Sequence, residues 1–488
     1  MKKAIILLVN TRWFNGRTNL ELPAAVPILT SILNESFEYE VIDCNGLNLN
    51  EEQTVEVIKK AAPDIALITA SSIIYHKNYA KGAELVKNVS KNIITVMGGV
   101  YPTTSSEHVM EDHNVDYIML GHAEERLCQF LNAILNKEDL SEIKGIGYRV
   151  NGQVIITPVE TYIGDLDKMV KPDYSKIDMS PYVDASRVST SHISKYGKRE
   201  VPITTSYGCP HNCIFCSTRT ISGRKVAYRD VDDVIEEMRY FKEKYQVDSI
   251  VFWDDNVLSD EKRAKELFRR MISEKFNFKV RLMSAAIWHL NEEILDLMVE
   301  AGVYSMTVSL ESGCDRVLHQ IVRKPFKKEI VPGAVKMCRE RNIFVIANMI
   351  IGFPGETWNE IRESIAFGEM CDFDYLMINI ATVLPQTDLY KISKEQGYLP
   401  DNFDFYDTNS FTGNFSKGIL TTDEFTPMEL EILRSFEWDR INFSTAEKRK
   451  RICEFRGVSE DELSEFRKES RRILGTGGWL QKEKTEAE

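Results

Sequence analysis

The sequence of 488 residues contains no long apolar run. A helix that spans a bilayer needs roughly 18–20 consecutive apolar residues, and no stretch approaches that length. Lys2 and Lys3, followed by the apolar residues 4–9, look like the start of a signal peptide. That apolar segment is too short, however, and residues 10–12 end it without a small-residue cleavage site. We therefore predict a cytoplasmic protein without a membrane span.

The chain also has no excess of positive charge. Its 61 Lys and Arg residues stand against 74 Asp and Glu residues, which gives a formal net charge of −13. A general nucleic-acid surface needs clustered Lys and Arg, so we predict no nucleic-acid partner, although the count leaves room for a local basic patch. At roughly 100–200 residues per domain, the length predicts two to four domains.

Two further patterns are missing. The nine cysteines show no regular disulfide spacing, which is typical of a reducing compartment. No G-x-G-x-x-G follows the first predicted strand, which argues against a nicotinamide dinucleotide. The protein is therefore not predicted to be a disulfide-stabilised or NAD-binding one.

What the chain does have is a concentration of thiols. Cys209, Cys213 and Cys216 lie within eight residues, and the next cysteine is Cys314. Cysteine thiolates hold the irons of iron–sulfur clusters, and three of them on a [4Fe–4S] cluster would leave one iron open for a reactive ligand. A structural zinc site is the alternative, but such sites usually pair C-x-x-C with a second, distant pair.

The first 135 residues alternate buried strands with amphipathic helices. This pattern predicts a parallel sheet with right-handed crossovers, hence a doubly wound, Rossmann-like α/β domain. Ligands of such folds bind outside the carboxyl ends of the strands. The predicted strands are 3–10, 39–45, 65–72, 93–100 and 117–121, and the predicted helices are 23–34, 51–61, 79–90, 105–111 and 123–135.

Six further strand–helix units follow residue 200. They predict a partial (β/α)6 barrel of the TIM type, two units short of the full barrel, with its active site at the carboxyl ends of the strands. After Pro385 the pattern becomes helical and charged, over 427–442, 445–455 and 459–474, and it ends in a polar tail at 481–488 that we predict to be disordered. The predicted barrel strands are 201–207, 249–254, 279–285, 305–311, 343–351 and 375–384.

The C-x-x-x-C-x-x-C spacing, with Phe215 just before the last cysteine, resembles the radical S-adenosylmethionine (SAM) enzymes. This resemblance implies that SAM binds the open iron and that groups at the strand ends hold the rest of it. Ser309-Leu-Glu311-Ser-Gly313 is similar to a family Gly-x-Glu-Ser-Gly motif, with Ser309 in place of the first glycine. The SAM contacts that the resemblance implies are Phe215, Asp254, Asp255, Ser309, Glu311, Arg323 and Asn348.

The amino-terminal half is similar to the cobalamin-binding domain that precedes the cluster domain in one branch of that family. The similarity rests on Ser71-Ser72, on the Gly98-Gly-Val-Tyr-Pro-Thr103 turn, and on Asp116-Tyr117 followed by Gly121-x-x-Glu124. A doubly wound domain that has lost its ligand is the alternative. The implied cobalamin contacts are Asn10, Arg12, Trp13, Ser71, Ser72, Gly98, Gly99, Val100, Tyr101, Gly121 and Glu124.

Histidine ligation of cobalt would normally show as Asp-x-His-x-x-Gly after the first strand, and this chain has no such motif there. His113 lies in the nearest similar string, which lacks the motif's Asp and Gly, so we interpret it as a surface residue. We therefore expect cobalamin to bind with its nucleotide tail displaced and without a histidine on cobalt.

Several of these residues have a plainer interpretation. Asp255 and Arg323 could instead form surface salt bridges. Cys44, Cys128, Cys338, Cys371 and Cys453 are expected to be buried apolar-like residues. Cys314 is expected to be buried as well, and exposure would decide whether it is reactive.

The resemblance implies a cobalamin-dependent radical SAM methyltransferase, which methylates an unactivated carbon through a 5′-deoxyadenosyl radical and methylcobalamin. The same cofactors could instead support a rearrangement, a cyclisation or a ring contraction. A methylthiotransferase should have three more amino-terminal cluster cysteines, where only Cys44 and Cys128 occur. A non-catalytic cobalamin sensor would leave the three-cysteine motif unexplained.

The predicted partners are a small-molecule or peptide substrate and an electron donor such as flavodoxin or ferredoxin. The predicted domains are a cobalamin-binding domain at 1–138, a connector at 139–198, a radical SAM barrel at 199–390 and a mostly helical domain at 391–488.

Overall fold

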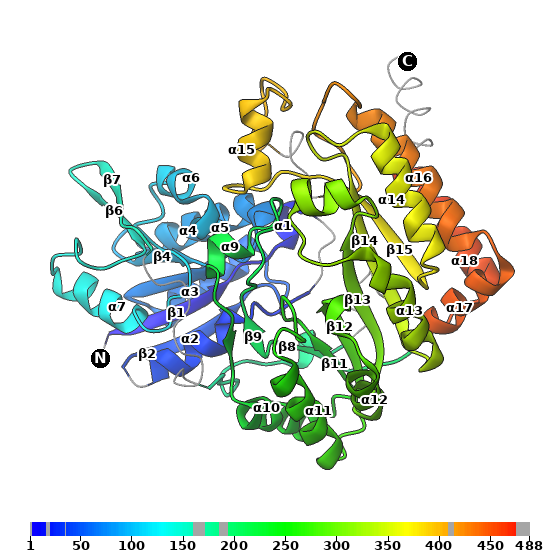
Figure 1. Cartoon of the computed structure of the whole chain (residues 1–488). Helices are drawn as coiled ribbons and strands as arrows, with labels where there is room; N and C mark the ends of the chain where they lie inside the picture. The colour runs from blue at the N-terminus through cyan, green and yellow to red at the C-terminus, as the bar shows by residue number, and fades with distance from the viewer. Residues whose placement is uncertain are drawn as a thin grey trace. The chain divides into compact units, whose positions relative to one another are not determined.

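The computed structural model describes residues 2–15, 20–34, 36–159, 171–184, 194–407 and 414–474. The chain forms two compact units (Figure 1): unit 1 comprises residues 1–190 and 218–246, and unit 2 comprises 191–217 and 247–488. Among the described residues, no helix is long and apolar enough to cross a membrane. The polar tail at 481–488 and residues 160–170 and 185–193 of the predicted connector lie outside the described residues.

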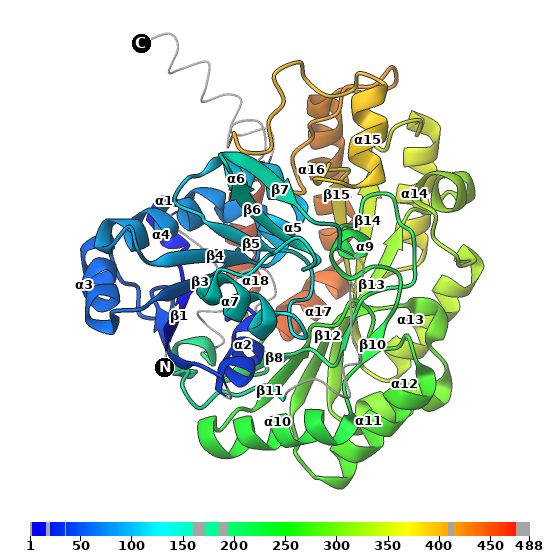
Figure 2. The ribbon, with the colours of Figure 1, turned by 90° about the vertical axis from the view of Figure 1, so that its left-hand side faces the viewer.

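Unit 1 is built on a seven-stranded sheet in the order β2-β1-β3-β4-β5-β6-β7 (Figure 2). Strands β1 to β5 run parallel, and β6 and β7 form an antiparallel hairpin on β5. The order in which successive strands are added to the sheet reverses between β1 and β3, and doubly wound sheets bind ligands at such a point. The strands are β1 Lys3–Leu8, β2 Glu38–Asp43, β3 Ile65–Thr69, β4 Ile94–Gly98, β5 Tyr117–Met119, β6 Ile146–Val150 and β7 Gln153–Ile156.

The helices of unit 1 follow the predicted positions closely. Helix α3 begins with a capping box in which the Asn50 side chain accepts from the backbone of Gln53, and the Gln53 side chain accepts from the backbone of Asn50. The helices are α1 Arg12–Asn15, α2 Ala25–Asn34, α3 Glu51–Ala61, α4 His76–Val89, α5 Val100–Thr104, α6 Ser106–Glu111, α7 Leu127–Asn136, α9 Thr218–Ser222 and α10 Val231–Tyr245.

Unit 2 contains a six-stranded parallel sheet in the order β15-β14-β13-β12-β11-β8. The exposure of β15 alternates residue by residue, with Leu376, Ile378 and Ile380 buried. Helix α16 lies along the open edge of β15, since Arg434 Nε donates to the Ile378 carbonyl and Asn442 Nδ2 donates to the Leu376 carbonyl. The strands are β8 Glu200–Ile203, β11 Ser249–Phe252, β12 Lys279–Ala285, β13 Val303–Glu311, β14 Phe344–Ile351 and β15 Tyr375–Ile380, and a short strand, β9, covers Ser206–Tyr207.

The helices of unit 2 include three at the carboxyl terminus that pack on one another. Asp439 of α16 forms ion pairs with Arg467 and Arg471 of α18. The helices are α11 Glu261–Ser273, α12 Glu292–Glu300, α13 Val331–Glu340, α14 Trp358–Met370, α15 Asp388–Glu395, α16 Pro427–Phe443, α17 Ala446–Arg456 and α18 Glu460–Leu474, together with a π-helix, η5, at Val317–Val322.

The structure confirms the predicted fold class, with differences at the ends of elements. The first barrel strand, predicted over 201–207, is interrupted and forms β8 and β9. The turn after β4 contains a short helix, α5, that the sequence did not predict. The predicted domain boundaries stay predictions, and the grouping of residues 218–246 with unit 1 was not anticipated.

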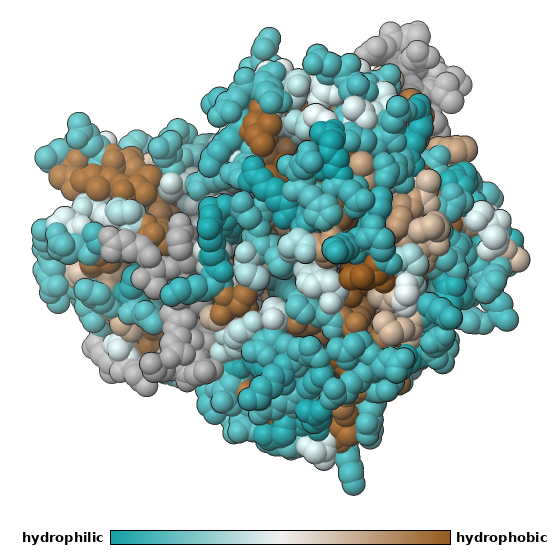
Figure 3. Space-filling model, viewed as in Figure 1, coloured by the Kyte–Doolittle hydropathy of each residue, from teal (hydrophilic) through white to brown (hydrophobic). Residues whose placement is uncertain are grey.

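Part of the predicted connector packs on unit 1. The backbone N–H of Asp173 donates to the Pro27 carbonyl at 2.8 Å, and the Tyr182 hydroxyl donates to the carboxylate of Asp43. The surface in Figure 3 is largely hydrophilic, with an apolar patch over the β6–β7 hairpin, where Val150, Val154 and Ile155 are exposed.

Candidate functional site

The three clustered cysteines lie on a loop of unit 2 that follows β9. Cys209, Cys213 and Cys216 are all half-buried, and none forms a disulfide. The loop is held by its backbone, because the N–H of Ile214 donates to the Val322 carbonyl and the N–H of Leu389 donates to the Ile214 carbonyl. Unit 2 therefore presents three thiols from a single fixed loop at the carboxyl end of its first strand.

Two aspartates after β11 hold the start of this loop. Asp254 is 3% exposed and accepts hydrogen bonds from the Thr205 and Ser206 hydroxyls at 2.7 and 2.6 Å. Asp255 accepts from the backbone N–H of Gly208 at 3.0 Å, directly before Cys209. Burial raises the pKa of Asp254, although these hydrogen bonds oppose the shift. Both predicted SAM contacts therefore position the cysteine loop, and direct contact with SAM stays a prediction.

A buried ion pair lies close to the thiols. Nζ of Lys324 is 3.3 Å from Oε1 of Glu311, and both side chains are more than nine-tenths buried. Burial opposes the charge on Lys324, but Glu311 and the thiols of Cys213 and Cys209 outweigh it, so the pKa of Lys324 lies above its ordinary value. Lys324 thus supplies a positive charge where thiolates and a carboxylate would gather.

Lys324, which the sequence analysis did not identify, lies beside Glu311, whereas its neighbour Arg323 was the predicted SAM contact. Arg323 is 39% exposed, and its guanidinium donates to Asp388 at 2.6 Å. This is the surface salt bridge that we had weighed for it. The only sequence signal was the adjacent pair of cations, which does not indicate which side chain points inward.

Burial also affects the thiols themselves. It raises the pKa of Cys213 to about 12 and raises that of Cys209 as well, while Lys324 acts in the opposite direction on both. Among the described residues, no three or more His, Cys, Asp or Glu side chains already converge as a metal-ligand set. The assignment of these cysteines as cluster ligands therefore rests on their spacing, their shared loop and their mutual proximity.

Aromatic side chains surround the cysteine loop. The ring of Phe215 lies 6.1 Å from that of Phe353, in the turn after β14. His211 contacts the edge of Trp288, which stacks on Phe326 at 5.0 Å. These rings pack on one another beside the cysteines, and only Phe215 was predicted from the sequence.

The two predicted polar residues within the strands share one face of the sheet. Ser309 of β13 is in register with Asn348 of β14, which is in register with Met377 of β15. All three are half-buried, whereas the residues next to them on each strand are buried. The opposite face is covered by α14, because a Cβ on Gly368 would lie 2.8 Å from Met349 Cε. Ser309 and Asn348 therefore lie on the face that α14 leaves uncovered.

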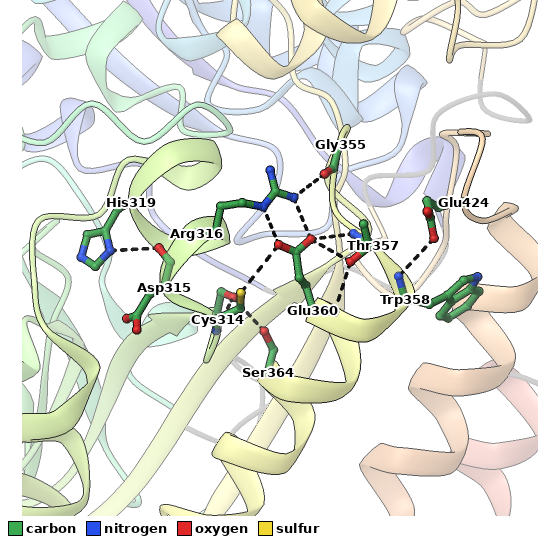
Figure 4. Close-up of polar contacts among 11 residues, drawn as sticks. Cys314, Asp315, Arg316, His319, Gly355, Thr357, Trp358, Glu360, Ser364 and Glu424 are labelled. Carbon is green, nitrogen blue, oxygen red and sulfur yellow. Dashed lines mark hydrogen bonds and ion pairs between the residues drawn. The ribbon is translucent and has the colours of Figure 1, made fainter.

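Cys314 belongs to a separate polar cluster (Figure 4). Its Sγ lies 3.8 Å from Oε1 of Glu360, which pairs with Arg316. Arg316 lowers the pKa of Glu360 to about 2, and burial raises the pKa of the thiol. Cys314 is 5% exposed, so it is a buried structural thiol, as are the other non-motif cysteines apart from the half-buried Cys128.

The carboxyl edge of the unit 1 sheet brings the predicted glycine turn against β3. Gly99 has φ +112° and ψ −163°, a conformation that is essentially restricted to glycine. A Cβ there would lie 2.6 Å from the Ala70 carbonyl oxygen. Ser71 and Ser72 follow Ala70, and the Tyr79 hydroxyl contacts Ser71. The backbones after β3 and β4 therefore meet at this edge, and only glycine at position 99 allows the approach.

Buried hydroxyls at the same edge lack partners. Thr69 Oγ1, at the end of β3, and Ser105 Oγ, after α5, have no hydrogen-bond partner among the described residues. Buried polar groups are nearly always paired, so these two sites fit a polar ligand that supplies the missing bonds. Neither residue was predicted from the sequence.

The side chains of the predicted cobalamin contacts after β1 form hydrogen bonds within the protein. Asn10 Nδ2 and Trp13 Nε1 both donate to the Leu49 carbonyl, and Arg12 donates to the Asn45 carbonyl. These bonds stabilise the loop after β2. Their assignment to cobalamin stays a prediction, and the structure places their polar groups in a loop–loop network.

Three histidines of unit 1 have different environments. His113 is exposed, as expected. His76 Nδ1 is 3.1 Å from the Ile73 carbonyl oxygen. His122 Nε2 is 3.1 Å from Ser222 Oγ, and its Nδ1 is 3.5 Å from Glu124 Oε1. That none of them coordinates cobalt stays a prediction.

Comparisons with known proteins agree with both sites. Residues 203–368 match the family model of the radical SAM superfamily, and residues 19–131 match that of the B12 binding domain. An uncharacterized methyltransferase of Pyrococcus horikoshii is 29% identical over 76% of this chain and 78% of its own length. The cytidylyl-2-hydroxyethylphosphonate methyltransferase of Streptomyces wedmorensis is 25% identical over 82% and 80%.

The fold also matches a solved structure. The radical SAM methyltransferase TsrM of Kitasatospora setae, solved with cobalamin and a [4Fe–4S] cluster, aligns with a TM-score of 0.66 at 18% identity, over 82% of this chain and 79% of its own. The two family models imply a [4Fe–4S] cluster and SAM for unit 2 and cobalamin for unit 1. The thiol loop beside Lys324 and the edge at Gly99 fit these groups. The chain therefore combines a domain of the radical SAM superfamily with a B12 binding domain.

Proposed function

We propose that this protein is a cobalamin-dependent radical SAM methyltransferase that methylates an unactivated carbon. The proposal rests on one observation. A single chain carries a three-thiol loop with a buried lysine in one unit and a ligand edge with unpaired hydroxyls in the other. Relatives named as methyltransferases align with it at 29% and 25% identity, and a magnesium-protoporphyrin IX monomethyl ester cyclase aligns at 24%, so methyl transfer is the leading function and a cyclisation is the second.

The chemistry would come from the cofactors. When bound, the cluster with SAM supplies a radical that abstracts hydrogen from carbon, and cobalamin supplies the methyl group, at a cost of two SAM molecules and two electrons per turnover. A reduced protein such as flavodoxin or ferredoxin is therefore the electron donor that we propose.

The residues of this chain bind and orient these groups. Cys209, Cys213 and Cys216 would hold the cluster, and the protonated Lys324 offsets the negative charge that collects there. Glu311, at the end of β13, and Asn348, within the neighbouring strand β14, would meet SAM. The backbone around Gly99, with the hydroxyls of the same edge, would hold cobalamin.

We further propose a small-molecule or peptide substrate, a cytoplasmic location and no nucleic-acid partner, in keeping with the charge of −13. The domain boundaries that we propose are 1–138 for cobalamin, 139–198 for the connector, 199–390 for the barrel and 391–488 for the helical part.

The test is anaerobic incubation of the reconstituted holoenzyme with SAM, a reductant and candidate substrates, followed by mass spectrometry. Cytidylyl-2-hydroxyethylphosphonate and tryptophan are the first probes. The first appears in the name of the Streptomyces wedmorensis relative, and the second is the substrate bound in a structure of TsrM. A product heavier by one CH₂ group, together with S-adenosylhomocysteine and 5′-deoxyadenosine, supports the proposal. The Cys213→Ala variant is the negative control.

Formation of 5′-deoxyadenosine with a rearranged product of unchanged mass would contradict methyl transfer. Retention of full methylation after removal of cobalamin would contradict the role of unit 1.

A further inference from the structure

The chain that leaves the cysteine loop enters unit 1 almost at once. Helix α9 begins at Thr218, two residues after Cys216, and belongs to unit 1. It lies against α5, which follows the glycine turn of β4. A Cβ on Gly121 would lie 3.7 Å from the Ile221 carbonyl oxygen, so the turn after β5 also runs beside α9. Helix α9 therefore contacts two of the segments predicted to bind cobalamin.

One side chain links α9 to this edge by hydrogen bonding. His122 Nε2 lies 3.1 Å from Ser222 Oγ at the end of α9, and Ser222 is 6% exposed. On its other side, His122 Nδ1 faces Glu124 Oε1 at 3.5 Å. A carboxylate at Nδ1 favours the tautomer with its proton there, which leaves Nε2 to accept from the Ser222 hydroxyl.

The partner of this histidine is itself buried and incompletely bonded. Burial opposes the charge on Glu124, but His122 outweighs it, and the pKa of Glu124 lies below its ordinary value. Glu124 Oε2 has no hydrogen-bond partner among the described residues. Arg126 donates to the His122 carbonyl at 2.7 Å and fixes the backbone of the same turn. The turn therefore holds the imidazole in one orientation towards α9.

We propose that His122 is a positioning residue that fastens the chain leaving Cys216 to the cobalamin-binding edge, so that cobalamin binding there changes the environment of the cluster. The inference rests on the proposed function for the identity of the two cofactors. Its basis is the series of contacts from Glu124 through His122 to Ser222. In addition, α9, which contains Ser222, begins only two residues after Cys216 in the sequence. The same three residue types also occur in hydrolases, but Ser222 is buried against the turn and has no access to a substrate.

The test uses hydroxocobalamin as the probe and hydrogen exchange of residues 209–222 in the reconstituted full-length protein as the readout. In the unmodified protein, cobalamin should slow exchange in this segment and change the paramagnetic resonance of the reduced cluster. In His122→Phe and Ser222→Ala, the slowing should fall about fivefold, the equilibrium factor for loss of one hydrogen bond. His122→Gln, whose amide can still bond Ser222, should restore part of it.

His113→Phe is the matched control, because His113 is an exposed histidine of the same unit. Circular dichroism establishes that each variant is folded, and Ser222→Ala carries the test if His122→Phe does not fold. Equal protection in Ser222→Ala and the unmodified protein would overturn the proposal. No response to hydroxocobalamin in the unmodified protein would overturn it as well. Either result would leave methyl transfer to its own test, which measures the mass of the product and its dependence on cobalamin.

Discussion

Different chemical groups line the carboxyl edges of the two sheets. In unit 2 the edge is made of charged side chains that are buried and paired, such as Glu311 with Lys324. In unit 1 it is made of close backbone at Gly99 and of neutral hydroxyls, two of which have no described partner. Isolated buried charges are far more costly than unpaired hydroxyls, so only the second kind of group can be left open for a ligand.

This difference indicates how each unit prepares for its cofactor. Lys324 is held in place by Glu311 and can offset the negative charge of thiolates, so the site in unit 2 is organised before any ligand binds. The edge of unit 1 offers space and hydrogen-bonding groups for a large ligand that completes them. Substitutions should therefore have larger effects in unit 2 than in unit 1.

The largest effect is expected at the cysteines. Cys209→Ala, Cys213→Ala or Cys216→Ala should each abolish cluster loading and 5′-deoxyadenosine formation, because no neighbouring cysteine can replace the lost ligand. Iron and sulfide analysis after anaerobic reconstitution measures the loss, and hydroxocobalamin binding should persist. Cys338→Ala, at a buried thiol outside the motif, is the control and should keep its cluster. A full cluster in any motif variant would refute the ligand assignment.

The next effect separates two adjacent cations. Lys324→Met leaves the buried carboxylate of Glu311 without its ion-pair partner. It should lower the free energy of unfolding by about 3–5 kcal/mol and abolish SAM cleavage. Arg323→Met removes an exposed ion pair with Asp388 and should cost about 0–1 kcal/mol. Urea denaturation and 5′-deoxyadenosine release measure the two. If Arg323→Met is the more damaging change, the inward orientation of Lys324 is wrong.

A smaller effect is expected at the glycine turn of unit 1. Gly99→Ala would force a Cβ against the Ala70 carbonyl and should destabilise the protein by about 1–3 kcal/mol while weakening cobalamin binding. Gly152→Ala is the control, since Gly152 also has positive φ but nothing lies within 4 Å of its Cβ position. Thermal unfolding and titration with hydroxocobalamin measure both. Equal cobalamin affinity in the two variants would show that the close approach at Gly99 is unrelated to the ligand.

The smallest effect tests the unpaired hydroxyls. Thr69→Val should leave stability nearly unchanged, because the hydroxyl has no described partner, yet weaken hydroxocobalamin binding about fivefold, the equivalent of one hydrogen bond. Thr54→Val is the control, for which the opposite result is expected. Thr54 is buried and donates to the Asn50 carbonyl at 2.8 Å, so stability should fall while cobalamin binding holds. A loss of stability without weaker binding in Thr69→Val would place this hydroxyl outside the ligand site.

Much of the fold could be predicted from the pattern of apolar residues. Helix α3 and strand β12 occupy the predicted ranges, since each has a clear period and its own boundary signals. Most predicted strands extended too far at their carboxyl ends, as at Thr69, where the structure ends β3. The chain there stays apolar or small beyond the last ladder hydrogen bond, so composition does not reveal where pairing stops.

The sequence by itself determined the order of the elements, the α/β class and the loop of Cys209, Cys213 and Cys216, because these depend on local period and spacing. Only the tertiary structure decided that Lys324 rather than Arg323 is buried beside Glu311, and that α9 groups with unit 1, where it contacts α5. Both outcomes depend on which face of a turn is covered by residues distant in sequence. Side-chain direction at such turns follows from packing, and one-dimensional spacing does not contain it.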